Sequence, residues 1–378
     1  MNCKFYMPTN VLMGENCVRE NAKLFSELGT RALLVTGARS AKLCGAQDDV
    51  IAVLSEYGIE YQVFDKIMAN PVIDVVYEGA EAAKKMKADL IISIGGGSPM
   101  DAGKAIALLA AQDIKREDLF SGDYGDEILN MIHIPTTSGT GSEVTQYSVL
   151  TNEAAETKMS ISSPLLFPKA ALLDPRYTMG LGAKSTVNTA IDAFSHAVEG
   201  MLSVRANRIT DQLACDAISA IASCFGALRL TAAGASGMLS YEEREKLQYA
   251  SMIAGIVIAH TGTTAVHSMG YSLTFFKGAD HGRANGLLLA DFLKFTAARL
   301  ADEKRSDVTD RIFAAAGLSG ADELRALLSG LLGEREAVSE EEIQKYTGIA
   351  AKAKNVKNSI VMPARDDIEM IYRNSLRS

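Results

Sequence analysis

The sequence has little of several residue types that mark whole classes of protein. Among its 378 residues are only five cysteines, Cys3, Cys17, Cys44, Cys215 and Cys224. They are odd in number, scattered, and never spaced as Cys-x-x-Cys. This argues against a disulfide framework and indicates reduced thiols in a cytoplasmic protein. None has the surroundings of a nucleophile.

Excess positive charge and long apolar runs are also lacking. The net charge is −8, and no basic face stands out that would neutralise phosphates, which argues against nucleic acid as a partner. The longest apolar stretches, such as Ser251–Ala259, are too short to span a bilayer, and the first residues lack the apolar core of a signal peptide. We therefore expect no membrane partner.

The remaining composition is ordinary for a globular enzyme, with 48% hydrophobic and 22% charged residues. A chain of 378 residues is long for one core, so two or three domains are expected.

The first half alternates short apolar runs with helical patterns. The predicted strands are Arg31–Thr36, Tyr61–Phe64, Ala88–Ile94 and Met131–Pro135, with helices at Asp48–Tyr57 and Ile73–Met86. This alternation predicts a doubly wound, Rossmann-like α/β domain that binds a nucleotide at the carboxyl ends of its strands. His133 lies in the last of these strands, and we interpret it as a core residue rather than a ligand.

The second half lacks strand signals, and helical spacing predominates. The predicted helices are Val187–Ser203, Ile209–Leu228, Tyr241–Ala259, Ala265–Leu273, Gly286–Leu300, Asp307–Ala316, Ala321–Leu332, Ser339–Ala353 and Arg365–Leu376. Leu173–Tyr177 is the expected hinge, because Pro175 disfavours helix in the residue before it. We therefore predict an α/β dinucleotide-binding domain at residues 1–177 and an all-helical metal-binding domain at 178–378.

A glycine-rich turn after the strand ending at Ile94 is the first candidate phosphate site. Its predicted cofactor-binding residues are Gly95, Gly96, Gly97, Ser98 and Asp101. Ser98 fits the N-cap and Asp101 the third position of the following helix, a variant of the capping box. The helix N-terminus would then offer free N–H groups to a pyrophosphate. The turn matches neither the standard dinucleotide fingerprint nor a Walker loop.

A second glycine turn, Pro135–Glu143, follows the next strand. Either turn alone could simply connect a strand to a helix. Two such turns after consecutive strands favour a crevice that both of them line.

A carboxylate and three histidines form the candidate metal site. Asp192 and His196 are four residues apart, so on a helix they share one face, while His267 follows a second apolar helical run and His281 lies in a turn. Three nitrogens and one carboxylate oxygen suit Fe(II) or Zn(II). The alternative for the Asp192–His196 pair is a surface hydrogen bond.

These segments together resemble the iron-containing (group III) alcohol dehydrogenases, and within that family the members similar to 1,3-propanediol dehydrogenase. The similarity runs almost end to end and includes Phe5–Thr9, Gly95–Lys104, Pro135–Thr145, Leu173–Tyr177 and the metal stretches. Glycerol dehydrogenases and dehydroquinate synthases share this fold but generally bind zinc through three ligands. The Asp192 and His196 pair indicates the four-ligand branch.

The resemblance implies a chemistry. Fe(II) bound by Asp192, His196, His267 and His281 would act between the domains as a Lewis acid. A hydride would pass between NAD(P) and a small primary alcohol, diol or aldehyde. A homodimer is expected by family analogy, and the segment Phe5–Leu12 resembles a family strand that either pairs across subunits or forms a lone sheet edge.

Two departures from common members bear on detail. Many members have an acidic residue after the first strand, where this chain has Gly37 followed by Arg39 and Ser40. This leaves room for a 2′-phosphate and predicts a preference for NADP over NAD. Further positions that match the family's cofactor contacts are Asn70, Thr136, Thr137, Thr140 and Lys158.

The second departure concerns the proton relay. Tyr271 stands where many relatives have a histidine thought to relay the proton. His260, seven residues before His267, is a second candidate, unless it is a hydrogen-bonded core histidine. The predicted catalytic residues are thus His260, His267 and Tyr271. Phe275 and Phe276 either shape the alcohol pocket or simply pack.

Two rival functions stay open. One is a zinc- and NAD-dependent lyase or polyol dehydrogenase of the same fold, although a lyase would need a basic cluster that is not visible near the site. The other is a non-catalytic relative that binds a metal or nucleotide.

Overall fold

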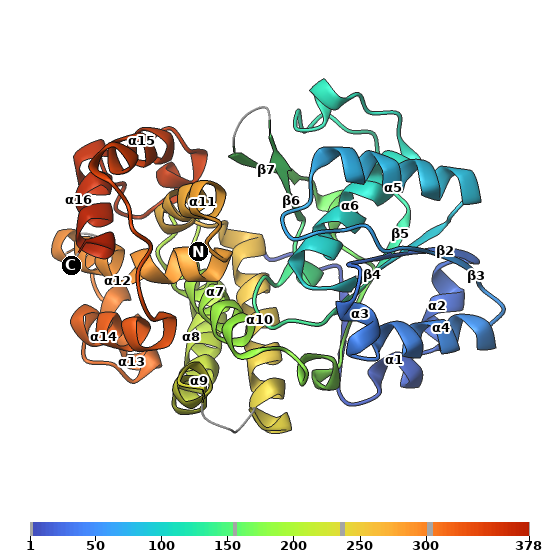
Figure 1. Ribbon diagram of the computed structural model, residues 1–378, viewed down its shortest axis with the longest axis horizontal. Coiled ribbons are helices and arrows are strands. Elements are labelled where there is room, and N and C mark those ends of the chain that lie inside the picture. Colours follow the sequence, from blue (N-terminus) through green and yellow to red (C-terminus); the bar gives the residue numbers. More distant parts are fainter. Residues whose placement is uncertain (1–2, 154–156, 235–238, 301–304, 378) are drawn as a thin grey trace. The chain divides into compact units, whose positions relative to one another are not determined.

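The computed structural model describes residues 3–153, 157–234, 239–300 and 305–377 (Figure 1). Its contacts divide the chain into two compact units. The N-terminal unit is Tyr6–Leu181, and the C-terminal unit is Gly182–Ser378 together with Met1–Phe5. The first unit carries the glycine turns and the second carries the metal-ligand candidates.

A six-stranded parallel sheet forms the centre of the N-terminal unit. In spatial order its strands are β1 (Asn10–Met13), β8 (Ala170–Leu173), β5 (Asn130–Pro135), β4 (Leu90–Gly95), β2 (Arg31–Thr36) and β3 (Glu60–Phe64). The register places Thr36 beside Ile94 and Gly95 beside Pro135. The carboxyl ends of β2, β4 and β5 therefore meet at one edge, and the turns that follow them are neighbours.

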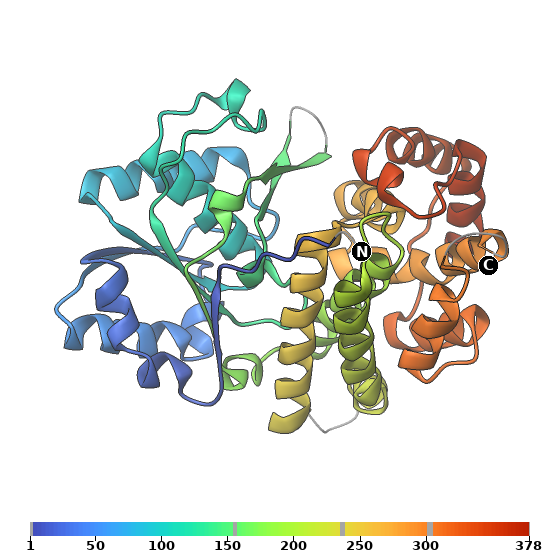
Figure 2. The ribbon, with the colours of Figure 1, turned by 180° about the vertical axis from the view of Figure 1, so that it is seen from behind.

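Helices cover both faces of this sheet, as Figures 1 and 2 show. One face carries α5 (Ile73–Met86) and α6 (Gly97–Ala111); the other carries α1 (Cys17–Glu20), α2 (Lys23–Leu28), α3 (Ser40–Leu43) and α4 (Ala46–Glu56). Successive strand residues point to opposite faces. Leu33 accordingly belongs to the apolar cluster that includes Ile106 of α6, whereas Leu34 belongs to the cluster that includes Val50 of α4. Burial on both faces explains the continuous apolar runs and confirms the doubly wound fold.

One strand of this unit was expected only as one of two alternatives, a sheet edge, and a small second sheet was not predicted. Strand β1 pairs with β8 in parallel at the edge of the sheet, Asn10 beside Ala170. A two-stranded antiparallel sheet is formed by β6 (Tyr147–Asn152) and β7 (Thr157–Ser162). The 3₁₀ turns among the described residues of this unit are η1 (Arg116–Asp118), η2 (Ser142–Val144), η3 (Pro164–Leu166) and η4 (Pro175–Thr178).

The C-terminal unit is helical, as predicted. Its helices are α7 (Ala183–Met201), α8 (Arg208–Ser223), α9 (Phe225–Ala232), α10 (Tyr241–Thr261), α11 (Ala265–Lys277), α12 (His281–Arg299), α13 (Val308–Ala316), α14 (Ala321–Leu332), α15 (Glu340–Ala350) and α16 (Arg365–Leu376), with the 3₁₀ turn η5 (Lys354–Asn358). The predicted helix Ile209–Leu228 is wrong in one respect, because the chain bends by 48° between α8 and α9.

The start of α12 corrects a second expectation. His281 is the first residue of this helix and does not lie in a turn before a helix that begins at Gly286. Glycine lowers helix propensity, which made the earlier residues resemble a loop. Here the glycines serve packing, since a Cβ at Gly282 would lie 1.9 Å from the carbonyl oxygen of Asn188, and one at Gly286 would lie 2.5 Å from Ile191 Cγ2.

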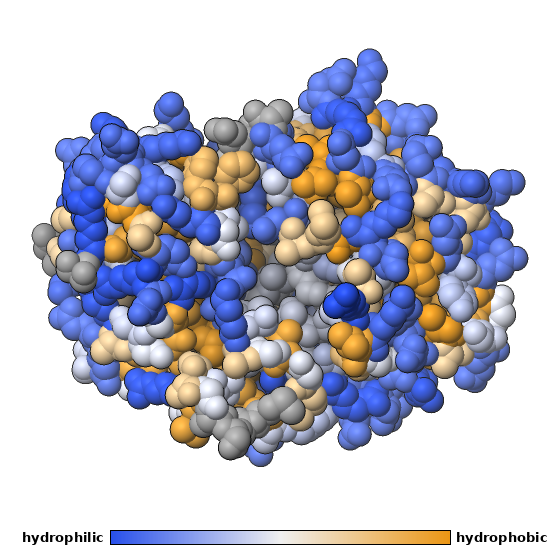
Figure 3. Space-filling model, in the orientation of Figure 1, coloured by the Kyte–Doolittle hydropathy of each residue, from blue (hydrophilic) through white to orange (hydrophobic). Residues whose placement is uncertain are grey.

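The face shown in Figure 3 is mostly hydrophilic, with apolar residues in small separate patches. Among the described residues no single helix is long and apolar enough to cross a membrane. Two bent pairs, α8 with α9 and α10 with α11, meet the criteria of length and composition only.

Candidate metal centre

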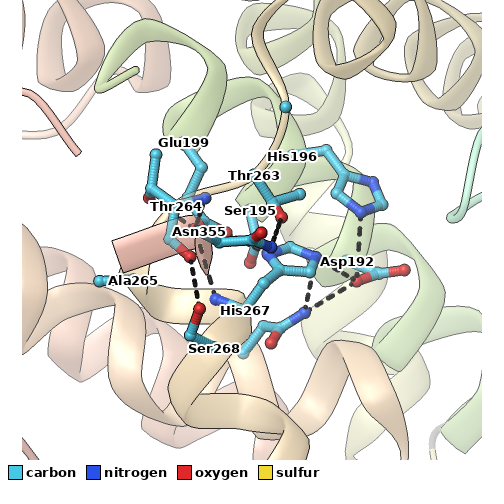
Figure 4. A network of polar contacts seen from close by, with 12 residues as sticks. Asp192, Ser195, His196, Glu199, Thr263, Thr264, Ala265, His267, Ser268 and Asn355 are labelled. Carbon is cyan, nitrogen blue, oxygen red and sulfur yellow. Dashed lines mark hydrogen bonds and ion pairs between the residues drawn. The ribbon is translucent and has the colours of Figure 1, made fainter. Parts of the chain in front are cut away.

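The four predicted ligands converge inside the C-terminal unit. Asp192 and His196 lie one turn apart on α7, His267 lies on α11, and His281 begins α12. The Nε2 atoms of the three histidines lie 3.9, 3.8 and 3.9 Å from Asp192 Oδ1, in the order His196, His267 and His281. Figure 4 shows His196 and His267 directed toward the carboxylate.

These distances are too long for hydrogen bonds but fit atoms that share an ion. Ligand bonds of about 2.1 Å in a tetrahedral arrangement set the ligand atoms about 3.4 Å apart. Ligand atoms of Asp192, His267 and His281 lie within 4.8 Å of one another, and the His196 ring stacks on His267 with centroids 4.8 Å apart. Asp192, His196 and His267 are buried, and His281 is partly exposed. The residues therefore fit Fe(II) or Zn(II).

Two opposing effects act on the Asp192 carboxyl. Burial by itself would raise its pKa, because the charged form loses water. The facing histidines His196, His281 and His267, with a hydrogen bond from Asn285, outweigh burial and bring the pKa below its ordinary value. Asp192 is therefore a carboxylate, the form that binds a cation.

Asn285 adds a donor that the sequence analysis missed. It is fully buried on α12, one turn after His281. Its Nδ2 atom donates to Asp192 Oδ1 at 3.1 Å and lies 3.1 Å from His267 Nε2 and 3.3 Å from His281 Nε2. The amide thus contacts three of the four candidate ligands.

Glu199 was also missed. This fully buried residue of α7 accepts hydrogen bonds at Oε1 from Thr264 N at 2.8 Å and Thr264 Oγ1 at 2.6 Å, and its Oε2 contacts His267 Nδ1 (Figure 4). The signal was present in the sequence. Asp192, His196 and Glu199 stand at positions i, i+4 and i+7, which lie on one face of a helix.

The two candidate proton relays have different surroundings. The Tyr271 ring stacks on His281, with centroids 5.6 Å apart, and meets His267 edge-on at 6.5 Å. His260 stacks on Phe5 at 4.2 Å, and its Nδ1 lies 2.7 Å from the carbonyl oxygen of Ile256. The spacing of seven residues does not place His260 and His267 on one helical face, because α10 and α11 are separate helices bent by 112°. Its role as a relay stays a prediction.

In the N-terminal unit, the two glycine turns lie against each other. A Cβ at Gly96 would lie 3.0 Å from Thr137 Oγ1, and one at Gly97 would lie 2.7 Å from Thr140 Cγ2. Gly95 has φ +151°, and a Cβ there would lie 2.6 Å from Pro99 Cγ. Side chains are therefore excluded along this turn, as close approach of a phosphate requires.

The predicted cap of α6 is wrong. The N-cap residue is Gly96 and the helix begins at Gly97, so Ser98 lies inside the first turn. Its Oγ accepts a hydrogen bond from Asn70 N at 3.2 Å instead. This bond joins two predicted cofactor-binding residues, and the first N–H groups of α6 stay free of side-chain caps.

Asp101 is engaged by the protein itself. Its carboxylate accepts hydrogen bonds from Ser142 Oγ at 2.6 Å and Val149 N at 3.1 Å. The fully buried Lys104 lies 3.9 Å away and donates to Ser142 Oγ at 2.8 Å. Burial lowers the pKa of Lys104 to about 8, against the opposing effect of Asp101. Asp101 and Lys104 thus tie α6 to the second glycine turn.

The remaining predicted cofactor residues lie in the same unit. Arg39 and Ser40 are exposed where α3 begins, and a Cβ at Gly37 would lie 3.7 Å from Ser40 Oγ. Thr136 is buried, and its N–H donates to the carbonyl oxygen of Gly95 at 2.9 Å.

Lys158 lies on β7, and its charge helps to lower the pKa of Asp101, although burial raises that pKa overall.

His133, which we interpreted as a core residue, is fully buried on β5. Burial brings its pKa well below the ordinary value, so its imidazole is neutral.

Comparisons with known proteins agree along the chain. Residues 8–175 match the family profile described as iron-containing alcohol dehydrogenase, and residues 186–376 match the C-terminal profile of the Fe-containing alcohol dehydrogenase family. The chain is 36% identical over 301 residues to 1,3-propanediol dehydrogenase of Citrobacter freundii, covering 78% of this chain and 73% of that one. It is 34% identical over 305 residues to alcohol dehydrogenase 4 of Schizosaccharomyces pombe, covering 79% and 71%.

Solved structures extend the likeness to the whole chain. An iron-containing alcohol dehydrogenase from Thermotoga maritima is 37% identical, with a TM-score of 0.89 and full coverage of both chains.

Proposed function

The chain belongs to the iron-containing alcohol dehydrogenase family, and from that premise we propose that it transfers a hydride between a nicotinamide cofactor and a small primary alcohol, diol or aldehyde. One observation carries the proposal. Three histidine Nε2 atoms lie 3.8 to 3.9 Å from a single oxygen of a buried carboxylate. We propose Asp192, His196, His267 and His281 as ligands of Fe(II), with Zn(II) as the alternative ion.

The chain's own residues hold and orient the reactants. When bound, Fe(II) supplies a Lewis acid that lowers the pKa of an alcohol, and the nicotinamide supplies the hydride acceptor or donor. The free N–H groups at the start of α6, beside Gly96 and Gly97, bind the cofactor's phosphates. Tyr271, stacked on His281, is the group proposed to carry the alcohol proton through its phenol oxygen.

The turn after β2 supports a preference for NADP. The Cβ of an acidic side chain at position 37 would lie 3.3 Å from the carbonyl oxygen of Ile67, which is shorter than an ordinary van der Waals contact. Without that carboxylate, the exposed Arg39 and Ser40 leave a place for a 2′-phosphate. A kcat/KM for NADH equal to or above that for NADPH would contradict this part of the proposal.

The testing experiment follows NADPH consumption with a panel of short aldehydes. The protein is prepared anaerobically and assayed with and without added Fe(II). Consumption that depends on Fe(II) is the expected result. No turnover with any divalent metal and either nicotinamide would overturn the proposed activity in favour of a lyase or a non-catalytic binding protein.

A variant separates catalysis from binding alone. We expect His267→Ala to lose turnover, because the change removes a ligand nitrogen. Its circular-dichroism spectrum should stay that of the parent. The protein is further proposed to be a cytoplasmic homodimer by family analogy, and light scattering checks the oligomeric state.

A further inference from the structure

We propose that Glu199 is a positioning residue of the metal centre, which fixes the ring of His267 so that its Nε2 lone pair faces the ion. The inference rests on the proposed metal site. It adds a residue that binds neither metal nor substrate and acts through a ligand.

The contacts of Glu199 show how one carboxylate joins two helices. Oε1 accepts from Thr264 N at 2.8 Å, from Thr264 Oγ1 at 2.6 Å and from His267 N at 3.3 Å. These donors lie at the N-terminus of α11, where Thr264 is the N-cap residue but makes no side-chain cap of its own. An acceptor on α7 therefore caps α11, and negative charge is favourable at that end.

The second oxygen of Glu199 contacts His267 Nδ1 (Figure 4). A neutral imidazole carries one N–H, and a carboxylate can only accept a proton from it. The hydrogen of His267 is therefore on Nδ1, and Nε2 carries the lone pair. This is the form in which a histidine binds a metal through Nε2.

Asn285 supports the same assignment from the opposite side of the ring. Its Nδ2 lies 3.1 Å from His267 Nε2 and also donates to Asp192 Oδ1 at 3.1 Å. Because Asp192 can only accept, its contact fixes which end of the Asn285 amide is the nitrogen. That nitrogen can only donate, and after the bond to Asp192 its second N–H faces both His267 Nε2 and His281 Nε2. A hydrogen on His267 Nε2 would therefore face another donor.

Burial indicates a role beyond stability. Glu199 is fully buried and His267 is 2% exposed. Removing a carboxylate from water is costly, and an apolar residue of similar size often packs at least as stably. A carboxylate at this position is explained by the orientation that it imposes on His267.

Glu199→Gln tests the proposal with the smallest change of shape. Three donors face Oε1, so the glutamine oxygen takes that side and its NH₂ group faces His267 Nδ1. Nδ1 must then accept, the ring proton moves to Nε2, and the lone pair for the metal is lost. We expect the affinity for Zn(II) or Co(II), measured by competition with a chromophoric chelator, to fall by about 10- to 100-fold.

Thr264→Val is the matched control. It removes one hydrogen bond to the same carboxylate but leaves the contact with His267 in place. We expect this variant to melt at a lower temperature and to bind metal as the parent does. Equal loss of metal affinity in both variants would mean that Glu199 acts only by stabilising the fold, and would overturn the proposal.

The ring proton can be observed directly. The chain has five histidines, so the ¹⁵N shifts of the rings can be assigned in the metal-free protein, at a pH high enough for the rings to be neutral. We expect His267 to carry its proton on Nδ1 in the parent and on Nε2 in Glu199→Gln. A proton on Nε2 in the parent overturns the proposal even if the variant does not fold. A parent that binds no metal contradicts the proposed function, whereas a parent and a Glu199→Gln variant that bind equally contradict only this inference.

Discussion

Gly282 of α12 lies directly against Asn188 of α7, so that a Cβ at Gly282 would stand 1.9 Å from the Asn188 carbonyl oxygen and 2.7 Å from Asp192 Cβ. His281, one residue before, is brought to Asp192 by this close packing. His281 can therefore reach Asp192 because Gly282, the next residue, has no side chain that would hold α12 away from α7.

We therefore expect Gly282→Ala to weaken both the fold and the metal site. Overpacking in a closed core costs about 1–3 kcal/mol, and relief requires α12 to move away from α7. The free energy of unfolding and the Zn(II) affinity should both fall. Gly348→Ala on α15 is the control, because a Cβ there meets no atom within 4 Å. That control should be neutral or slightly stabilising.

Tyr271→Phe should separate proton transfer from binding. The phenylalanine ring keeps the stacking on His281 and removes only the hydroxyl. Because a positioned acid or base contributes about 10²–10⁴-fold, kcat should fall within that range while KM changes little.

The pH–rate profile of Tyr271→Phe should lose one limb relative to the parent. His260→Ala, which removes the stacking with Phe5, should keep both the profile and kcat. The opposite pattern would assign the proton relay to His260.

Arg39→Ala should act on one cofactor. If the guanidinium binds the 2′-phosphate, its loss removes a charge-assisted hydrogen bond of about 1.5–3 kcal/mol. The kcat/KM for NADPH should then fall about tenfold or more, with that for NADH unchanged. Lys42→Ala is the control and should leave both values unchanged, because Lys42 is an exposed cation of α3, the helix that Arg39 precedes, and pairs with Asp65 at 3.7 Å. Equal losses for the two cofactors would argue against recognition of the 2′-phosphate.

Glu143 should make stability depend on pH. It is the buried last residue of the second glycine turn, and burial raises the pKa of its carboxyl from 4.5 to about 7. The folded state therefore binds the proton more tightly than the unfolded chain does. The corresponding stability is present below pH 4.5 and is lost as the pH rises through about 7.

Glu143→Gln should remove this dependence and raise the free energy of unfolding above pH 7 by about 2–3 kcal/mol. Urea unfolding of both proteins, on either side of that window, measures the difference. Parallel curves for the two proteins would show that Glu143 does not titrate there.

Strong periodic segments could be predicted from the sequence, and weakly marked ones could not. Strand Arg31–Thr36 and helix Ile73–Met86 have the predicted bounds, because burial on both faces or on one face leaves a clear pattern of apolar residues. Strand β8 has only four residues, and β1 owes its conformation to pairing with β8, which no local pattern reveals. For both strands, pairing with distant strands and not local sequence determines the extended conformation.

The candidate site divides in the same way. Asp192 and His196 could be paired by their helical spacing, whereas His267 and His281 were added because three nitrogens and one carboxylate oxygen suit a metal ion, and no local pattern showed that the fold brings them together. Glu199 was overlooked although its spacing was equally regular, since a lone glutamate resembles a solvated side chain until its burial is known. The prediction of Ser98 as the N-cap residue was wrong because the helix begins earlier, at Gly97, and Gly96 occupies the N-cap position.

The pairing of β1 with β8 has a consequence for how the protein is made. Asn10 and Ala170 are neighbours in the sheet but are 160 residues apart in the chain. At a synthesis rate of about 5–20 residues per second, the first strand waits roughly ten to thirty seconds on the ribosome for its partner. The β1 edge of the sheet is therefore completed last, and the first residues to leave the ribosome are among the last to pair in the sheet.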